Sequence, residues 1–532
     1  MTARRGAARI IGALALAVFV ACGSALAGTP TSVFVMAMQI DDIISLDPAE
    51  VFEFSGAEYS GNVYDRLVYF DHDDPSVIGP GIAESWSVSE DGRSFSFIIR
   101  EGVSFHSGNP LTAVDAAYSL RRVIALNLAP AFILAQFGFA PDNIETTIRA
   151  PDARTLVFTT DRPYAPSFVL NCLTAGVASV VDSALLAEHE EGGDWGHGWL
   201  RTHSAGSGAF SLRAWKPNEA LILDAYPDHW RGAAAIERAV IRHIAEPATQ
   251  RLLLEKGDID LARNLGADQL AGLAGNDDIR VWPSPKGAIY YLGLNQNNPV
   301  LSQPGVRKAL RWLIDYSLLQ QTFLAETAVV HQTILPRGFL GALDATPFSL
   351  DVGKAKALLA QAGYPEGFTV TMDTRNTVPL IDLAQSIQAS FSLAGITLEL
   401  LPGDGKQTLT KYRARNHDIY FGLWGADYQD PHTNASVFAD NPDNAGDALN
   451  KTLAWRNAWE TPELSGLAAA AMIERDVAAR VVLYEDIQRR LMADSPFVVM
   501  FQKVDVIAQR VGLKGFVAGP TFDTVFYRGV TK

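Results

Sequence analysis

The feature that most constrains the fold is a regular alternation of predicted strands and helices between about residue 288 and residue 500. Short runs rich in β-branched and aromatic residues predict strands, and longer runs with apolar stripes predict helices. The predicted strands are residues 290–294, 368–372 and 396–400, and the predicted helices are residues 307–325, 351–362, 380–394 and 477–493. Alternation of this kind indicates an α/β lobe in which helices pack against a sheet.

Some helix boundaries are marked by residues with a local physical role. Thr112 and Asp115 precede an apolar stretch at the spacing of a capping box, in which each side chain satisfies a free backbone N–H group. Gly363 and Gly395 follow two predicted helices, where a left-handed residue is needed. These signals support one predicted helix start and two predicted helix ends.

The part of the chain before residue 288 has more hairpin-like segments, with strands predicted at residues 94–100 and 156–159. No long Gly-, Ser- or Pro-rich linker divides the sequence. We therefore expect lobes joined by short crossing strands, which suits hinge closure.

The length of 532 residues predicts two or three domains. The net charge of −15 argues against non-specific binding to nucleic acid and against a basic face for anionic membranes. Only two cysteines occur, Cys22 and Cys172, which excludes a disulfide framework and a cysteine-rich metal site. Cys172 stands among apolar residues and is predicted to be a buried core residue. We expect no cofactor and no bound metal.

Residues 1–27 have the organisation of an export signal. Arginines lie within residues 4–9, an apolar run follows at residues 10–21, and small residues at 25–27 form a cleavage site. The apolar run is shorter than the roughly 20 residues that a membrane-spanning helix needs. We expect a periplasmic protein, either released by cleavage or, if Cys22 belongs to a lipoprotein box, held by a lipid anchor.

A dozen short sequence blocks occur in the order typical of one protein family. The most diagnostic is REGVSFHSG at residues 100–108, followed by LTAVD at residues 111–115, and WGADYQDP stands at residues 424–431. The other blocks are residues 45–49, 63–68, 80–86, 89–92, 206–210, 215–217, 226–230, 257–260, 293–295, 306–310 and 362–365. With these blocks the chain resembles the substrate-binding proteins of peptide/nickel-type ABC importers, solute-binding protein family 5, including its dipeptide- and oligopeptide-binding members.

The resemblance implies a mixed α/β, two-lobed periplasmic binding protein. Lobe I would be discontinuous, formed by residues 28–288 and 503–532, with an inserted subdomain at about residues 65–185. Lobe II would be continuous, at residues 289–502. A small solute, in first place a short peptide, would be captured in the interlobe cleft by hinge closure and delivered to a membrane permease driven by an ATPase. The protein is expected to act as a monomer.

The same resemblance suggests ligand-binding residues. In peptide-binding relatives the aspartate of the Trp-x-x-Asp block pairs with the α-amino group of the peptide, and Asp427 occupies that position. A local alternative is that Asp427 caps a turn beside Asp430. Trp424 and Tyr428 flank Asp427 and would either wall a side-chain pocket or belong to the core.

Dipeptide-binding relatives place a carboxylate-pairing arginine close to the position of Arg375, so the resemblance makes Arg375 the candidate partner of the ligand carboxylate. The planar guanidinium suits bidentate carboxylate recognition. We expect it in a loop after the strand at residues 368–372, where Asp373 is an alternative local partner. Phe54 and Ser55 are expected to enter the cleft from lobe I, and Gly176 to offer backbone groups to an extended ligand.

Other functions remain open at this stage. Gln429 stands where many peptide-binding members have proline, and relatives also carry nickel complexes, oligosaccharides, opines and antibiotics. An additional role as a sensor that docks on a chemoreceptor is compatible with the same fold. An exported hydrolase is disfavoured, because no nucleophile elbow, zinc-protease motif or phosphate-binding loop is present. His106 is predicted to be structural, and the loop around Trp195 is either a surface loop or a lid.

Overall fold

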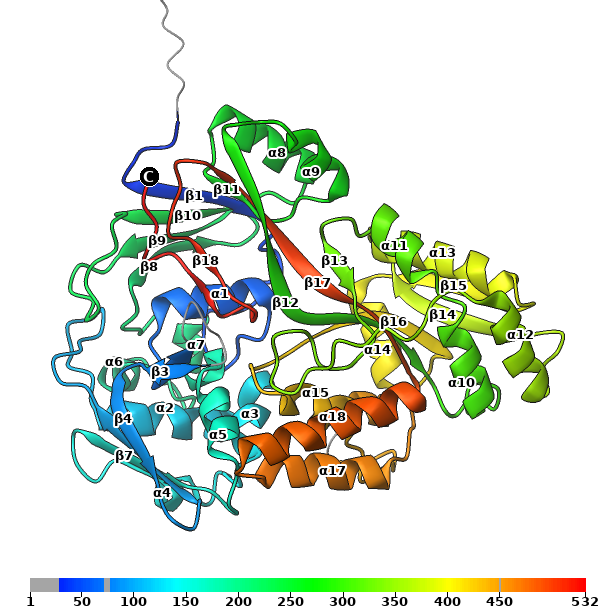
Figure 1. The fold of residues 1–532 in the computed structure, drawn as a ribbon. Coiled ribbons are helices and arrows are strands. Elements are labelled where there is room, and N and C mark those ends of the chain that lie inside the picture. The colour runs from blue at the N-terminus through cyan, green and yellow to red at the C-terminus, as the bar shows by residue number, and fades with distance from the viewer. Residues whose placement is uncertain (1–27, 71–76, 449–450) are drawn as a thin grey trace, which may run out of the picture.

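The computed structural model describes residues 28–70, 77–448 and 451–532. Two bodies are joined by a pair of long antiparallel strands, β12 (Ile279–Leu294) and β17 (Phe497–Arg510), which cross from one body to the other (Figure 1). Their register is irregular between Pro285 and Ile289. Short crossing strands were expected between the lobes, but these two strands have 16 and 14 residues. They are long because each strand belongs to the sheet in both bodies.

One large mixed sheet runs through the molecule, with the β12–β17 pair in its middle. Strands from the later part of the chain lie on one side of this pair and strands from the earlier part on the other. In spatial order the strands are β15 (Thr397–Gly403), β14 (Thr369–Arg375), β16 (Ile419–Gly425), β12, β17, β11 (Leu261–Ala262), β1 (Val33–Met38), β10 (Arg238–His243), β9 (Ala220–Ala225) and β8 (Phe210–Lys216), and β13 (Ala328–Val330) also pairs with β17.

The first body contains a second sheet formed by β4 (Ala83–Val88), β5 (Ser94–Ile99), β7 (Thr155–Thr159) and β6 (Ile148–Arg149). Alternate residues of β5 and β7 are buried, and α2 (Ala113–Leu126) packs against β6 and β7. The remaining elements of this body are α1 (Phe54–Val63), β2 (Val68–Phe70), β3 (Ile78–Pro80), η1 (Ala129–Ala131), α3 (Phe132–Ala135), α4 (Ile144–Thr147), α5 (Pro166–Leu173), η2 (Gly176–Ala178), α6 (Ser183–Glu188), α7 (His197–Leu200), α8 (Pro247–Lys256), α9 (Ala267–Leu273), β18 (Val517–Ala518) and β19 (Val525–Phe526).

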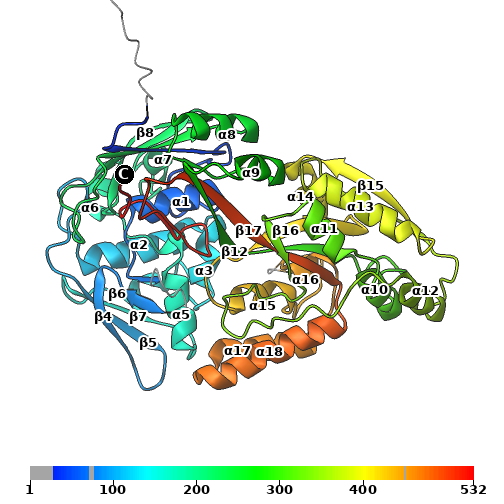
Figure 2. The same cartoon turned by 45° about the horizontal axis from the view of Figure 1, so that its top comes forward.

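In the second body, helices cover the strands that follow β12. Figure 2 shows α13 and α14 beside β15, with α17 and α18 together at the opposite edge of this body. The helices are α10 (Pro304–Arg311), α11 (Tyr316–Thr322), α12 (Val352–Gln361), α13 (Leu380–Ser392), α14 (Gly405–Arg413), α15 (His432–Phe438), α16 (Leu453–Arg456), α17 (Pro462–Ile473) and α18 (Val477–Ala493). The C-terminal segment after β17 returns to the first body (Figure 1).

Most of the predicted helix boundaries are confirmed. Thr112 and Asp115 form the capping box at the start of α2. Gly363 and Gly395 have φ values of 91° and 79° after α12 and α13, so they adopt the left-handed conformation that favours glycine. The helix predicted at residues 477–493 is α18 with the same bounds.

The single helix predicted at residues 307–325 is wrong. The chain forms α10 and α11 instead, because Asp315 begins a new helix by accepting a hydrogen bond from the Leu318 backbone N–H at 3.0 Å. Tyr316 then donates its hydroxyl to the Arg311 carbonyl at 3.0 Å, which fixes the break.

Cys172 is fully buried in the core of the first body, as predicted. The export signal and Cys22 lie outside the described residues. In the described part of the chain no single helix is long and apolar enough to cross a membrane. One bent pair of helical segments, α2 and residues 129–135, is long and apolar enough when the two are taken together. Many residues of this pair lie in the core of the first body.

Candidate ligand-binding cleft

A cleft with a volume of about 740 Å³ lies beside the β12–β17 pair and has walls from both bodies. The first body contributes the start of α1, the start of α9 and residues 38–42. The second body contributes the end of β14 and the residues around α13, while residues 503–506 of β17 form the base. A concave site of this size between two bodies is where a small ligand is enclosed most completely.

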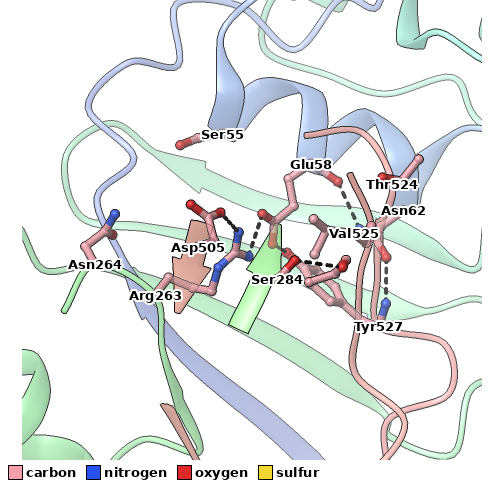
Figure 3. A network of polar contacts seen from close by, with 12 residues as sticks. Ser55, Glu58, Asn62, Arg263, Asn264, Ser284, Asp505, Thr524, Val525 and Tyr527 are labelled. Carbon is pink, nitrogen blue, oxygen red and sulfur yellow. Dashed lines mark hydrogen bonds and ion pairs between the residues drawn. The ribbon is translucent and has the colours of Figure 1, made fainter. Parts of the chain in front are cut away.

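A network of paired charges forms one wall of this cleft (Figure 3). Arg263 lies 3.0 Å from the Glu58 carboxylate and 3.3 Å from the Asp505 carboxylate. Tyr527 donates its hydroxyl to Glu58, and the Lys503 ammonium pairs with Asp505. Each buried carboxylate therefore has a cation or a donor, as the cost of desolvation requires.

The network holds Asp505 in its charged form. Burial alone would raise the pKa of Asp505, but the neighbouring Lys503, Lys286 and Arg263 hold it well below the usual range. The charges of Glu58 and Asp505 likewise raise the pKa of Arg263 despite its burial. This wall is thus electrostatically complete without a ligand.

The same wall joins α1 to the C-terminal segment. Asn62 donates to the Val525 carbonyl at 2.8 Å and accepts from the Tyr527 backbone N–H at 2.9 Å. Ser284 of β12 donates to the Ala518 carbonyl at 2.9 Å (Figure 3). The end of the chain is therefore a structural part of the cleft wall.

Asp427 follows β16 in the second body and is half-buried. No described residue forms a hydrogen bond or an ion pair with its carboxylate, although its backbone N–H donates to the Thr433 hydroxyl at 3.0 Å. Burial raises the pKa of Asp427 to about 7. The alternative that Asp427 caps a turn is wrong. The backbone N–H of His432 in this turn donates to Asp430 at 2.9 Å, and no described N–H group donates to the Asp427 carboxylate.

The two aromatic residues beside Asp427 differ in their surroundings. Tyr428 is 3% exposed, belongs to the core of the first body and contacts Phe168. Trp424 is half-buried, donates its indole N–H to Asn434 at 3.2 Å and packs against the core of the second body. Neither residue lines the 740 Å³ cleft.

Arg375 is the last residue of β14 rather than a loop residue, and it lines the cleft with an exposed side chain. The local alternative, a pair between Asp373 and Arg375, is wrong. Asp373 binds the Lys411 ammonium at 2.8 Å through both carboxylate oxygens. Among the described residues, Arg375 has no ion-pair partner.

Phe54 and Ser55 also line the cleft, and the Ser55 hydroxyl donates to the Gln39 carbonyl at 3.1 Å. Gly176 begins η2 and lies beside Arg66 and Asp523, outside the cleft lining. The structure thus brings Phe54, Ser55 and Arg375 together at one cleft. Asp427, Trp424, Tyr428 and Gly176 lie beyond its lining.

Two further candidates lie away from the cleft. His106 is bound through its imidazole to the Gly208 carbonyl at 2.9 Å, and burial lowers its pKa. The backbone carbonyl of Trp195 accepts a hydrogen bond from Arg122 at 2.8 Å, and the indole ring of Trp195 contacts the Tyr118 ring on α2. Within the described ranges, no group of three or more His, Cys, Asp or Glu side chains is arranged to hold a metal ion.

Sequence reasoning missed the charged wall and the aromatic residue Phe522. The contacts that Glu58 makes in this wall join residues 205 and 469 positions apart, which no local pattern reveals. One signal was present: Lys503 and Asp505 stand in the middle of a strand whose residues are mostly apolar. Charges within a buried strand indicate a paired network or a site.

Comparison with known proteins gives a consistent result. The sequence model described as bacterial extracellular solute-binding proteins, family 5 (middle), matches residues 77–446. Among curated proteins, the probable D,D-dipeptide-binding periplasmic protein DdpA of Escherichia coli is 28% identical over 487 residues, covering 91% of each chain. The peptide transport periplasmic protein SapA of Salmonella typhimurium is 27% identical over 498 residues, covering 89% of this chain and 87% of the relative.

A solved structure extends the similarity to three dimensions. The periplasmic binding protein DppA of Helicobacter pylori, in complex with the peptide STSA, superposes with a TM-score of 0.80 at 26% identity. The match covers 94% of this chain and 98% of the other. Two bodies joined by crossing strands are therefore shared along nearly the whole length.

Proposed function

Because the chain belongs to the family 5 bacterial extracellular solute-binding proteins, the substrate-binding components of ABC importers, we propose that its solute is a short peptide with a free amino terminus. The names of DdpA and SapA refer to peptides, and DppA was solved in complex with a peptide, which supports this choice. The proposal assigns no catalytic step to the protein.

The observation that carries the proposal is the unpaired carboxylate of Asp427. Even partial burial of a charged carboxylate is costly unless a cation or several donors meet it, and Asp427 is half-buried. No described residue supplies one, and burial raises the pKa of Asp427 to about 7. A peptide ammonium would supply the missing positive charge and return Asp427 to its charged form.

Arg375 is proposed to receive the ligand carboxylate. Its guanidinium is exposed at the cleft and has no ion-pair partner among the described residues. Phe54, Ser55 and Gly176 are proposed contacts from lobe I, and Trp424 and Tyr428 from lobe II.

The proposed mechanism is ligand-driven closure of two lobes, residues 28–288 with 503–532 (insertion at about 65–185) and residues 289–502. The irregular register of β12 between Pro285 and Ile289 supports a hinge at this boundary. A ligand favours the closed state only through contacts that it makes with both lobes. The closed monomer would then dock on a membrane permease driven by an ATPase, after export directed by residues 1–27.

The proposal is tested by thermal unfolding of residues 28–532 with three probes: di- to pentapeptides, the same peptides with acetylated amino termini, and nickel with histidine. A ligand at 100 times its Kd adds about 2.7 kcal/mol to the free energy of unfolding. We expect a higher Tm with free peptides and no change with acetylated ones. Stabilisation by nickel and histidine alone, or by acetylated peptides equally, would overturn the proposal.

A further inference from the structure

A second cavity, with a volume of about 140 Å³, lies in the first body and shares no lining residue with the 740 Å³ cleft. Its walls come from the end of α1 with the residues up to Tyr69, from the chain at residues 208–209 and 229–231, and from the C-terminal segment at residues 515–529. A cavity of this size is large enough for a small polyatomic ion. The function proposed for the cleft does not account for it.

Glycines allow the segments around this cavity to meet at backbone distance. An added Cβ at Gly208 would lie 2.6 Å from the Asn62 carbonyl oxygen, and one at Gly515 would clash with the Gly529 carbonyl. Gly208, Gly515 and Gly529 all line the cavity, and so does Gly61 at the end of α1. No side chain therefore fills the space from these four positions.

Two arginines line the cavity, Arg231 and Arg528, and neither has a carboxylate partner among the described residues. Arg231 donates to the Pro80 carbonyl at 3.1 Å, and its guanidinium carbon lies 4.5 Å from the ring centroids of Tyr69 and Trp230. Arg528 donates to the Arg231 carbonyl at 3.2 Å. A guanidinium has several N–H donors, so most of the donors in this pair have no acceptor in the described part of the chain.

The one carboxylate that lines the cavity, Asp65, is already occupied at both oxygens. It accepts from the Tyr69 hydroxyl at 2.7 Å, from the Ser207 hydroxyl at 2.9 Å and from the Trp230 indole N–H at 3.2 Å. His229 also lines the cavity and is 6% exposed. Its Nε2 lies 3.7 Å from Asp65, and no described residue forms a hydrogen bond with its Nδ1. The polar atoms left without a partner around the cavity are therefore nitrogens.

We propose that this cavity binds a small oxyanion, phosphate or a short carboxylate, between Arg231 and Arg528. The planar guanidinium presents paired N–H donors that match the oxygens of either anion. Two guanidinium charges face one lining carboxylate, so the charge balance of the cavity favours an anion. The proposal does not depend on which solute the cleft captures.

A bound oxyanion would join the turn at residues 229–231 to the C-terminal segment. That segment carries Phe522, whose ring stacks on Phe54 in the cleft lining with centroids 3.6 Å apart, and Tyr527, which donates to Glu58 in the charged wall. The ion would thus fasten the part of the cleft wall that comes from the end of the chain. Because it binds the folded state, it should also raise the Tm.

The test is isothermal titration calorimetry of residues 28–532 with sodium phosphate, sodium sulfate and sodium acetate at constant ionic strength. The variants are Arg231→Gln and Arg528→Gln, and Arg231→Lys keeps the positive charge in case the larger change impairs folding. The matched control is Arg456→Gln in the second body. Arg456 is likewise half-buried, lies over an aromatic ring, that of Tyr412, and donates to a backbone carbonyl.

We expect the wild type to bind at least one of the three anions and to show a higher Tm in its presence. Arg231→Gln and Arg528→Gln should each weaken binding by about tenfold or more, because each removes charge-assisted hydrogen bonds, and Arg456→Gln should leave the Kd unchanged. Tighter binding of phosphate and sulfate than of acetate assigns a tetrahedral anion, and the reverse order assigns a carboxylate. Absence of binding by all three anions, or an unchanged Kd in both cavity variants, overturns the proposal and leaves the proposed function of the cleft untouched.

Discussion

The carboxylates near the crossing strands differ in their partners: Glu58 and Asp505 are paired with cations or donors, and Asp427 is not. Glu58 and Asp505 are buried in a wall where Arg263, Lys503 and Tyr527 meet every charge. Asp427 is half-buried, and no described residue meets its carboxylate. The paired set stabilises a wall that exists without a ligand. For Asp427 the cost of partial burial is offset by protonation, which its raised pKa favours, or by a cation from outside the chain.

The largest effect should come from breaking the paired set with Arg263→Met. Glu58 and Asp505 then remain buried without their shared cation, so the free energy of unfolding should fall by about 3–5 kcal/mol. Urea denaturation measures this. Arg213→Met is the control, because the Arg213–Asp224 pair is exposed and should contribute less than about 1 kcal/mol. Equal losses in the two variants would contradict the distinction between buried and exposed pairs.

The unpaired set is tested by Asp427→Asn. The amide keeps the shape but cannot neutralise a peptide ammonium, so affinity for free peptides should fall by about 2–5 kcal/mol. Calorimetry with dialanine measures this, and the matched control is Asp382→Asn, at a carboxylate that lines the 740 Å³ cleft. Thermal stability of the unliganded variant should not fall, since no described partner is lost. A variant that binds dialanine like the wild type would remove Asp427 from the site.

The pH dependence of the free energy of unfolding tests the state of Asp427 in the unliganded protein. The pKa of Asp427 is raised from 3.8 to about 7, so the folded state binds more protons than the unfolded state between these values. Its contribution to the free energy of unfolding therefore falls as pH rises from about 4 to about 7, by roughly 1–3 kcal/mol. The difference between wild type and Asp427→Asn, measured by urea denaturation at several pH values, isolates this change. A constant difference across the range would mean that Asp427 is not desolvated.

The smallest effect is expected for Lys503→Met. Lys503 is partly exposed, and Asp505 keeps Arg263 as its cation when Lys503 is lost. The free energy of unfolding should fall by no more than about 1 kcal/mol. A loss as large as that of Arg263→Met would show that the wall depends on both cations equally.

Local signals in the sequence were sufficient for much of the fold. The capping box of Thr112 and Asp115 and the glycines after α12 and α13 depend on neighbours within one helical turn, and all were predicted correctly. The break at Asp315 was missed, because an aspartate inside an apolar periodic stretch is compatible with a continuing helix as well as a new cap.

The site was less accessible to prediction, because its contacts are long-range. The resemblance to family 5 led to Phe54, Ser55 and Arg375, which the structure places at one cleft. It did not lead to Arg263 or Phe522, whose partners lie hundreds of residues away in the sequence. Which charge is paired and which is left open follows from tertiary packing, and no local pattern carries that information.

The position of the cleft wall in the chain has a consequence for biosynthesis. Glu58 near the start of the protein receives its hydrogen bond from Tyr527, 469 residues later, and Phe522 reaches Phe54 over a similar separation. Phe522 and Tyr527 follow the other residues of the wall and of the cleft lining in the chain, so they are synthesised after them. A nascent or interrupted chain that lacks them retains an unfinished wall, with Glu58 deprived of one of its partners. A chain that ends before Phe522 would therefore lack both a hydrogen-bond donor to Glu58 and the ring that stacks on Phe54.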